Sequence, residues 1–464
     1  MVKSNLNDPI VAIATPPGQG AIGVIRLSGS SCIDILDRCF FGRNLTKVEG
    51  NTIHYGKIKR DDDSMIDECL VSIFIAPRSY TKEDSAEISC HGSPFILEEV
   101  VKLLISMGCR QANPGEFTLR AFLNGQLDLS QAEAVADLIA SENKISHELA
   151  LSQLRGGFSE QIKSLRQELI DFASLIELEL DFGEEDVEFA DRGRLLDLVE
   201  KIQVVISKLI KSFNYGNVVK KGVAVAIVGE PNVGKSTLLN ALLNEDRAIV
   251  SDIAGTTRDV IEDKITIEGI EFRFIDTAGL RETSDTIESI GINKTKEQIE
   301  KANIVLFIAE IAEDHHAIIK DYKAIPIKDN QASIILLNKI DQFHTCHAYD
   351  VEEAVSTFTG RVPCIAFSAK EGTAVERIKN KLVEIIKSDR IADVSTVTNL
   401  RHYEALKKAN DALDAVVKGI NSGITGDFVA MDIRQSLHHL GEITGEINTD
   451  DLLDSIFTRF CIGK

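Results

Sequence analysis

Residues 223–237 read VAVAIVGEPNVGKST and join an apolar run to a glycine-rich loop. The uncharged run of Val, Ile and Ala is typical of a strand that is buried on both faces. Gly229, Gly234, Lys235 and Ser236 match the pattern GxxxxGK[ST], in which backbone N–H groups cradle phosphates, the lysine reaches the β- and γ-phosphates and the hydroxyl binds Mg²⁺. The helical stretch that follows adds its N-terminal dipole. On this motif alone, a chance glycine-rich turn is the alternative.

A second apolar stretch, FRFIDTAG at 272–279, predicts a strand that ends in Asp276. An aspartate beside a phosphate-binding loop suits the second shell of Mg²⁺, and Gly279 can present its N–H to the γ-phosphate. The intervening segment GTTRD at 255–259 contains a threonine that can complete the metal shell when a triphosphate is bound. These two elements argue against a chance match.

A third apolar stretch, SIILLNKID, ends in Asn338, Lys339 and Asp341. The carboxylate of Asp341 can accept hydrogen bonds from N1 and the 2-amino group of guanine, which adenine lacks. The wrong base would leave a buried carboxylate unpaired at a cost of a few kcal/mol, so the motif predicts selection of GTP. Ser368, Ala369 and Lys370 follow a further apolar strand and are predicted to close the base pocket. Five elements in this order predict a GTPase domain.

One expected residue is missing from this domain. Leu280 stands directly after Gly279, where Ras-like GTPases have a water-orienting glutamine. A leucine cannot position water, so hydrolysis must recruit another group. The candidates are a carboxylate within residues 281–288 and a cation near Asn232.

Charge and composition limit the function classes. The 464 residues predict two to four domains, and a net charge of −21 argues against nucleic-acid binding through the overall field. Contact with RNA would therefore be local or shared with a more basic partner. We expect no membrane span, because no apolar run approaches the roughly 20 residues that a membrane helix needs. Eight cysteines without a CxxC pair fit a reducing cytosol and predict a cytoplasmic protein.

The hydrophobic period divides the chain into three predicted domains. Residues 1–122 alternate short apolar runs with turns and predict an α+β domain. Residues 123–217 and 386–464 have helical periodicity and are expected to join in one all-α bundle. Residues 218–385 form the α/β P-loop GTPase domain, inserted between the two helical segments, so nucleotide-driven movement would rotate it against the bundle. Within the first domain, Glu116 is expected to face a helix dipole.

The chain resembles the MnmE/TrmE family of tRNA-modification GTPases from end to end. The motifs that carry the resemblance are ATPPGQGAIGVIRLSG, PGEFTLRAFLNGQLDLSQAEAVADLI, GEPNVGKSTLLN, IAGTTRDV, DTAGLRET, EITGEI and the terminal FCIGK. An Era-type GTPase that acts on RNA without modifying it is the alternative. It predicts a basic C-terminal RNA-binding domain, whereas the residues after 388 are mixed in charge and helical in pattern.

The resemblance implies partners and cofactors. A partner of the FAD-dependent MnmG/GidA type, with FAD on the partner, would join this chain in a heterotetramer. Together they would build a carboxymethylaminomethyl or aminomethyl group on C5 of the wobble uridine of certain tRNAs. A 5-formyl- or 5,10-methylene-tetrahydrofolate would supply the one-carbon unit, and the chain would form a homodimer through its first domain. Ammonium and glycine both remain open as the nitrogen donor.

The resemblance also implies a folate site at Arg26, Glu87, Gln126 and Lys464. Arg26 and Lys464 could pair with the ligand's glutamate tail or ring acceptors, and Glu87 could bind the amino edge of the pterin. Gln126 departs from the family, which usually has a basic residue there. For Lys464 to take part, the chain end must reach the first domain, which we expect to be that of a second subunit.

In the GTPase domain the resemblance implies which groups take over the function of the missing glutamine. Glu288 would orient the attacking water, and a K⁺ ion would take the arginine-finger role, held by Asn232, Ser251, Ile253 and Thr256. Mg²⁺ would be held by Ser236 and Thr257, and Glu288, Asn232 and Lys235 form the catalytic set. The predicted GTP-binding residues are Asn232, Val233, Gly234, Lys235, Ser236, Thr237, Ser251, Asp252, Ile253, Ala254, Gly255, Thr256, Thr257, Asp276, Thr277, Ala278, Gly279, Asn338, Lys339, Asp341, Ser368, Ala369 and Lys370.

Overall fold

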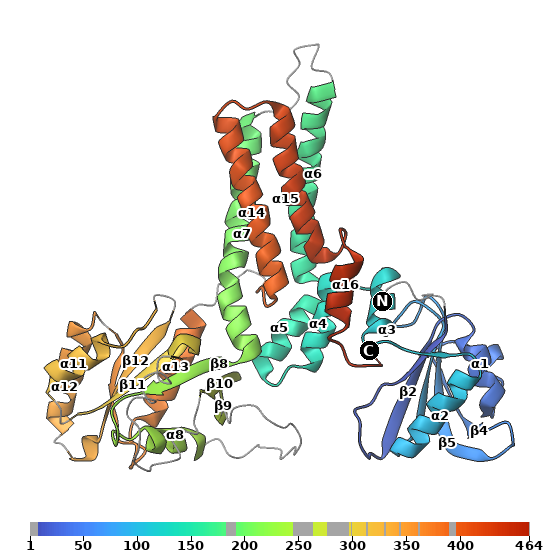
Figure 1. Ribbon diagram of the computed structural model, residues 1–464, viewed down its shortest axis with the longest axis horizontal. Helices are drawn as coiled ribbons and strands as arrows, with labels where there is room; N and C mark the ends of the chain where they lie inside the picture. The colour runs from blue at the N-terminus through green and yellow to red at the C-terminus, as the bar shows by residue number, and fades with distance from the viewer. Residues whose placement is uncertain are drawn as a thin grey trace. The chain divides into compact units, whose positions relative to one another are not determined.

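The computed structural model divides the chain into two compact units (Figure 1). One unit comprises Met1–Ala140, Ala150–Val199 and Asp411–Lys464, and the other comprises Ser141–Leu149 and Glu200–Asn410. The first unit contains both the N-terminal α+β part and helices from two distant segments. The boundaries of the three predicted domains stay a prediction. The structure describes residues 8–181, 192–244, 263–275, 297, 299–311, 314–328, 331–342, 345–360, 362–388 and 396–463.

The N-terminal part is built on a seven-stranded sheet with the order β3-β4-β5-β6-β2-β1-β7. Neighbouring strands are antiparallel except for the parallel pair β1 and β7. The strands are β1 Ile10–Ile13, β2 Ile22–Ser28, β3 Phe40–Phe41, β4 Thr52–Lys59, β5 Met65–Phe74, β6 Ser85–His91 and β7 Arg110–Gln111. The helical elements here are α1 Cys32–Cys39, the short 3₁₀ turn Leu45–Lys47, α2 Pro94–Ser106 and α3 Glu116–Leu123.

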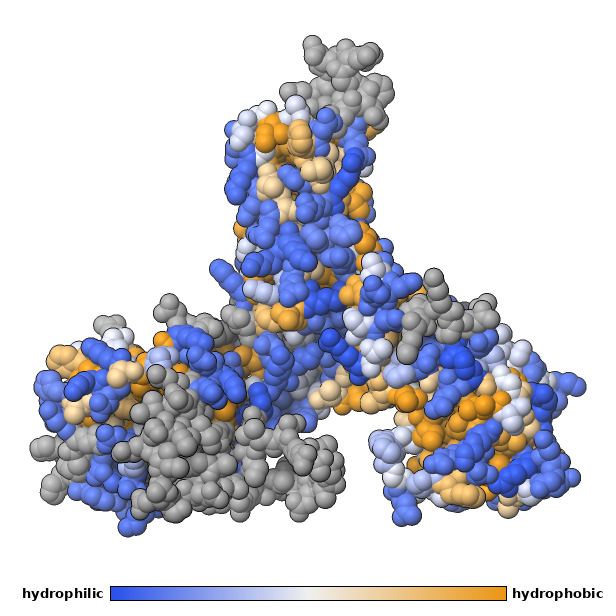
Figure 2. Space-filling view, in the orientation of Figure 1, coloured by the Kyte–Doolittle hydropathy of each residue, from blue (hydrophilic) through white to orange (hydrophobic). Residues whose placement is uncertain are grey.

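The two faces of this sheet have different partners. Helices α1 and α2 pack on one face, where alternate residues such as Ile25, Val71 and Ile88 are fully buried. Strand β5 shows the cause, because its buried and exposed residues alternate with the period of two that a strand imposes. On the opposite face, Phe117 of α3 packs against Ile10 and Ala12 of β1, and further along the sheet hydrophobic side chains stay exposed. Figure 2 shows hydrophobic residues among polar ones at the surface of this domain.

Helices from both ends of the chain pack together in the first unit. Helices α6 Gly157–Asp181 and α15 Gly426–Thr444 lie side by side (Figure 1). Arg166 Nε donates to Leu437 O at 3.3 Å, and Arg434 of α15 pairs with Glu177 of α6. Helix α16 Asp450–Phe457 packs on α3 and α4 Leu129–Ile139 in a small apolar cluster. Helices α5 Lys144–Leu154, α7 Arg192–Lys221 and α14 Leu400–Asn421 each have residues in both units.

The second unit contains a six-stranded sheet with the order β13-β12-β11-β8-β10-β9, parallel except for β9. Alternate residues of β8 face opposite layers: Val225 packs with α8 and α13, and Ala226 packs with the layer of α11 and α12. The strands are β8 Val223–Val228, β9 Asp263–Ile267, β10 Ile270–Phe274, β11 Ile304–Glu310, β12 Ala332–Asn338 and β13 Cys364–Ala366. The helical elements are α8 Lys235–Asn244, α11 His315–Lys323, the 3₁₀ turn Ile340–Gln342, α12 Thr345–Phe358 and α13 Val375–Ser388.

This architecture confirms the predicted fold class. An α+β part, helices from two discontinuous segments and an α/β P-loop part between them are all present. Within the described residues, no helix combines the length and the hydropathy needed to cross a bilayer.

Candidate functional site

The phosphate-binding loop connects the carboxyl end of β8 to the start of α8. Gly229 has a φ of 155°, and a Cβ there would collide with Ile308 O of the neighbouring strand β11. Gly234 has a φ of 103°, and a Cβ there would collide with the side chain of Asn338. Asn232, between the two, adopts a left-handed conformation with φ 63°. The glycines of the motif are therefore required by close backbone approach as well as by the turn.

The Lys235 ammonium lies against this loop. Its Nζ donates to Gly229 O at 2.9 Å and to Glu230 O at 2.6 Å. Burial lowers the pKa of Lys235, and the nearby Glu230 carboxylate opposes this shift only in part. In the first turn of α8, Ser236 is half-buried and Thr237 is exposed. The loop and the helix start thus carry the groups that phosphate and Mg²⁺ require, a cation and a hydroxyl.

Asn338 links the phosphate loop to the loops that are predicted to bind the base. Its Nδ2 donates to Val233 O at 2.7 Å, and its Oδ1 accepts from the backbone N–H of Ala369 at 3.0 Å. The side chain is 4% exposed, so these two hydrogen bonds satisfy a buried amide. Three segments that are more than 30 residues apart in sequence are held together by this single side chain.

The Asp341 carboxylate, which the sequence predicts to read the base, is oriented by its neighbours. Ser368 Oγ donates to Asp341 Oδ1 at 2.7 Å and accepts from Glu371 N at 3.2 Å. Lys339 has a φ of 70° and pairs with Glu310 at the end of β11. Lys370 is exposed. The structure therefore brings Asn338, Asp341, Ser368 and Ala369 together beside the phosphate loop.

Thirteen predicted site residues lie outside the described residues. They are Ser251, Asp252, Ile253, Ala254, Gly255, Thr256, Thr257, Asp276, Thr277, Ala278, Gly279, Glu288 and Lys464. Their roles stay predictions.

A second candidate site lies on the exposed face of the N-terminal sheet. Arg26 of β2 stands opposite Glu87 of β6, and its Nε and Nη2 lie 2.9 and 2.8 Å from Glu87 Oε1. The guanidinium lies between two aromatic rings, with Cζ 5.6 Å from the centroid of Tyr80 and 5.8 Å from that of Phe117. Tyr80 Oη and Thr118 Oγ1 of α3 are 2.9 Å apart, and burial raises the pKa of Tyr80. The arginine is thus held in one orientation by an ion pair and two cation–π contacts.

The other predicted folate residues lie on different segments. Gln126 is exposed just beyond α3, and its backbone N–H donates to Ala121 O at 2.8 Å. Residues near the chain end contact the first domain, as expected. The domain that they contact is that of the same chain, not that of a second subunit. Gly115 N donates to Cys461 O at 3.4 Å, and a Cβ on Gly463 would collide with Ile13 O at the end of β1. No second subunit is needed to bring residues 461–463 to this domain.

Sequence reasoning missed the charge network that anchors α3. The Glu116 carboxylate accepts from Arg110 Nη1 at 3.0 Å and from Arg120 Nη2 at 3.0 Å, and it also caps the backbone N–H of Asn113 at 2.9 Å. Burial raises the pKa of Glu116, but the two arginines and the N–H outweigh it, so the pKa is lowered overall. Arg120 is 1% exposed and also pairs with Glu83 at 3.1 Å. The i, i+4 spacing of Glu116 and Arg120 was the available signal.

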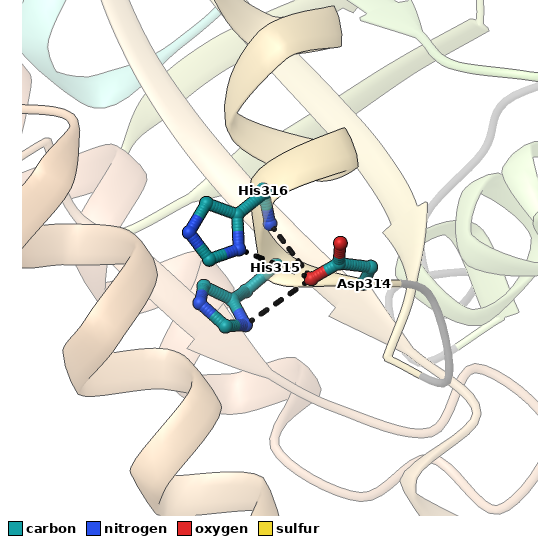
Figure 3. Close-up of side chains that lie close together, drawn as sticks. All are labelled: Asp314, His315 and His316. Atoms are coloured by element: carbon teal, nitrogen blue, oxygen red, sulfur yellow. Dashed lines mark hydrogen bonds and ion pairs between the residues drawn. The ribbon is translucent and has the colours of Figure 1, made fainter.

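One further group of potential metal ligands comes together within the described part of the chain, at Asp314, His315 and His316. Figure 3 shows both imidazoles directed at the same carboxylate, with Nδ1 to Oδ1 distances of 3.4 and 3.3 Å. The same oxygen accepts from His316 N at 3.2 Å and caps α11, and this backbone hydrogen bond lowers the pKa of Asp314. Helix capping explains the arrangement.

Two family models match the chain. A model described as the MnmE helical domain matches residues 129–461, and one described as the GTP-binding protein TrmE N-terminus matches residues 9–126. The chain is 52% identical over 464 residues to the tRNA modification GTPase MnmE of Cytophaga hutchinsonii, with 99% of both chains covered. It is also 52% identical over 473 residues to the tRNA modification GTPase MnmE of Christiangramia forsetii, with 99% of this chain and 100% of that one covered.

Among solved structures, the chain is similar to Era in complex with MgGDPNP and a segment of 16S ribosomal RNA. The identity is 27%, the match covers 40% of this chain and 65% of that one, and the TM-score is 0.28. At this TM-score the likeness supports no conclusion.

Proposed function

The chain belongs to the MnmE family of tRNA modification GTPases and is a GTP hydrolase, and we propose that it uses GTP hydrolysis to modify the wobble uridine of certain tRNAs. The observation that carries the hydrolase part is the Asn338 side chain, which joins the phosphate loop at Val233 to the guanine-reading loops at Ala369. An apolar side chain at this place would leave those loops unlinked. The tRNA part rests on relatives that are about half identical over nearly their whole length.

The product we propose is a carboxymethylaminomethyl or aminomethyl group on C5 of the wobble uridine. A partner of the MnmG/GidA type would contribute FAD and form a heterotetramer with this chain in the cytoplasm. The net charge of −21 supports a shared tRNA surface, because this chain alone repels a phosphate backbone. The more basic surface would belong to the partner.

GTP would bind with its phosphates in the loop 229–234 and its base against Asp341. Ser236 and Thr257 would hold Mg²⁺, which would neutralise phosphate charge during hydrolysis. Ser236 fits this role because it follows Lys235 in the first turn of α8 and offers a half-buried hydroxyl oxygen, a ligand type that Mg²⁺ prefers. Lys235 would leave the carbonyls of Gly229 and Glu230 to bind phosphate oxygens, which restores a stable environment for its charge.

We assign the catalytic assistance to a K⁺ site. Asn232, Ser251, Ile253 and Thr256 would hold the ion, and Glu288 would orient the attacking water. The left-handed turn at Asn232, which is exposed on the phosphate loop, supports the first of these ligands. GTP turnover in K⁺ should exceed turnover in Na⁺ at equal ionic strength by about 100-fold or more, since one preorganised contact to the charge of the transition state is worth about 10²–10³ in rate. Equal rates in a stopped-flow phosphate-release assay would remove the ion from the mechanism.

A reduced folate would bind beside Arg26 and Glu87 and supply a one-carbon unit. The residues fit such a ligand, because a partly exposed guanidinium and carboxylate lie beside the aromatic ring of Tyr80 on an open sheet face. Glu87 would accept from the amino edge of the pterin, and Arg26 would donate to a ring acceptor. Gln126 and Lys464 would complete the site, and Gly463 already lies at the end of β1.

The same sheet face would form the homodimer. Ile53 and Tyr55 of β4 are 66% and 62% exposed, and Leu70 of β5, paired with Tyr55, is 47% exposed. An apolar sheet face of this kind is typical of a protein–protein interface. The functional parts of this assembly would be the predicted domains 1–122, 123–217 with 386–464, and 218–385.

Mass spectrometry of the wobble uridine tests the function. Cells that lack the chain are complemented with wild type, with Lys235→Met, or with the control Lys102→Met, whose side chain is exposed on α2. Wild type and control should restore the modified nucleoside, and Lys235→Met should not, because it removes the cation that binds the triphosphate. Unchanged modification in cells without the chain would overturn the proposal and is what the Era-type alternative predicts.

A further inference from the structure

The loop between β5 and β6 connects the Arg26 site to the end of α3. Tyr80 of this loop lies against the Arg26 guanidinium. Thr81 Oγ1 lies 2.6 Å from Ser28 Oγ of β2, and Thr81 O accepts from Asn124 Nδ2 at 2.7 Å. The loop is therefore fixed both to the strand that carries Arg26 and to the segment that leads from α3 to Gln126.

Lys82, the next residue, brings an ammonium group to that segment. Its Nζ donates to Gly125 O at 2.8 Å, one residue before Gln126. Its backbone has a φ of 57°, a conformation that costs a lysine about 1 kcal/mol or more relative to glycine. A lysine therefore occupies a backbone conformation that favours glycine or asparagine.

The charge of Lys82 has no carboxylate partner among the described residues. This is unexpected in a chain with 72 acidic and 51 basic side chains, in which most half-buried cations near the N-terminal sheet are paired. A carbonyl satisfies one of the three ammonium protons and leaves the positive charge unopposed. The group is therefore available to an anionic ligand.

Gln126 cannot provide that charge. Its side chain is exposed and neutral, although the resemblance to the family assigns the position to ligand binding. The Lys82 ammonium is hydrogen-bonded to the carbonyl of Gly125, the residue before Gln126. The Lys82 ammonium, from the β5–β6 loop, can therefore supply the positive charge that a basic side chain at position 126 would supply.

We infer that Lys82 binds a carboxylate of the ligand at the Arg26 site, and that it is a specificity-determining residue for the glutamate moiety of a reduced folate. This inference rests on the folate site proposed above. Arg26 and Glu87 would bind the ring system, and Lys82 would select ligands that carry the carboxylate tail. The competing role is purely structural, because a lysine at the end of α3 also stabilises the helix dipole and the last carbonyls.

The two roles are separated by moving the charge. Binding of 5-formyltetrahydrofolate to the full-length chain is measured by calorimetry for wild type, Lys82→Gln, Gln126→Lys and the double variant Lys82→Gln/Gln126→Lys. Lys82→Gln should weaken binding about 10- to 100-fold, as expected for loss of a charge-assisted hydrogen bond, and the loss should shrink at high salt. The double variant should recover most of the affinity, because the charge returns at 126. Lys102→Gln, on the opposite face of the domain, should bind like wild type.

A ligand without the tail provides the second arm. The competitor 6-methyltetrahydropterin has no carboxylate. Its dissociation constant, obtained from displacement of 5-formyltetrahydrofolate, should be the same for wild type and Lys82→Gln. Equal weakening for both ligands, or no recovery in the double variant, would assign Lys82 to structure alone and overturn the inference. Unchanged folate binding in Lys82→Gln would also overturn it while leaving the folate site intact. Absence of folate binding to wild type would overturn the folate site and this inference together.

Discussion

Asp341 follows β12, and its carboxylate is oriented by Ser368 before any base arrives. Ser368 Oγ donates to Oδ1 at 2.7 Å, and Ser368 is fully buried. A carboxylate that is already oriented loses little conformational entropy when guanine binds. Asp341 itself is exposed in this structure, unlike the buried carboxylate expected from the sequence, so a mismatch becomes costly only when a bound base covers the carboxylate and leaves it unpaired.

Replacement of this carboxylate should change the preferred base. Asp341→Asn should lower GTP affinity about 100-fold, a few kcal/mol, and raise affinity for xanthosine triphosphate, whose C2 oxygen can accept from the new amide. Ser368→Ala is the matched control and should cost about tenfold for GTP without changing the preference. Affinities from fluorescent nucleotide displacement check this. An Asp341→Asn variant that still prefers GTP would show that the base is read elsewhere.

Helix α3 is the element on which the Arg26 site depends. It presents Phe117 to the guanidinium and Thr118 to Tyr80, and its position is held by the Glu116–Arg120 pair. Arg120 is 1% exposed, so its charge must be neutralised locally. Arg120 also donates to Asp8 O at 2.9 Å, which joins α3 to the segment before β1.

This pair should make stability depend on pH. The folded-state pKa of Glu116 is lowered, so its contribution is fully present above the unfolded value of about 4.5 and is lost as pH falls through the folded value. Glu116→Gln should therefore lower the melting temperature at pH 7, with a cost of roughly 3 kcal/mol. The difference from wild type should shrink below about pH 4.5. Scanning calorimetry from pH 7 to 3 measures it, with exposed Glu98→Gln as control. A difference that is constant with pH would rule out the ion pair as its source.

If the chain dimerises as proposed, its assembly should depend on the open face of the N-terminal sheet. Leu70 is central to that face, between Tyr55 on β4 and Ser89 on β6. Leu70→Arg should raise the dimer dissociation constant about 100-fold, because an unpaired charge would be buried at the centre of the interface. Ile105→Arg places the same charge on α2, on the other face, and should stay dimeric. Sedimentation velocity checks both. A dimeric Leu70→Arg variant would move the interface away from this face.

The sequence could predict the features that depend on residues close together along the chain. The GxxxxGKS and NKxD motifs are local, and each requires particular backbone conformations that Gly229, Gly234 and Lys339 adopt. Periods of two and of 3.6 residues identified the sheet and helical parts, because burial on one face imposes them. The fold class and the family were predicted correctly from these patterns. The site roles of residues 251–257, 276–279 and Glu288 stay predictions, as do the K⁺, folate, partner and dimer assignments.

The sequence by itself determined the order of the elements, the phosphate and guanine motifs and the faces of the strands, because neighbours along the chain control those properties. Only the tertiary structure decided which distant groups meet. Arg26 pairs with Glu87, which is 61 residues further along the sequence. Asn338 hydrogen-bonds to Val233, and Lys82 to Gly125, next to Gln126. These pairings depend on strand register and on helix packing, which many residues set jointly. No single stretch of sequence contains them.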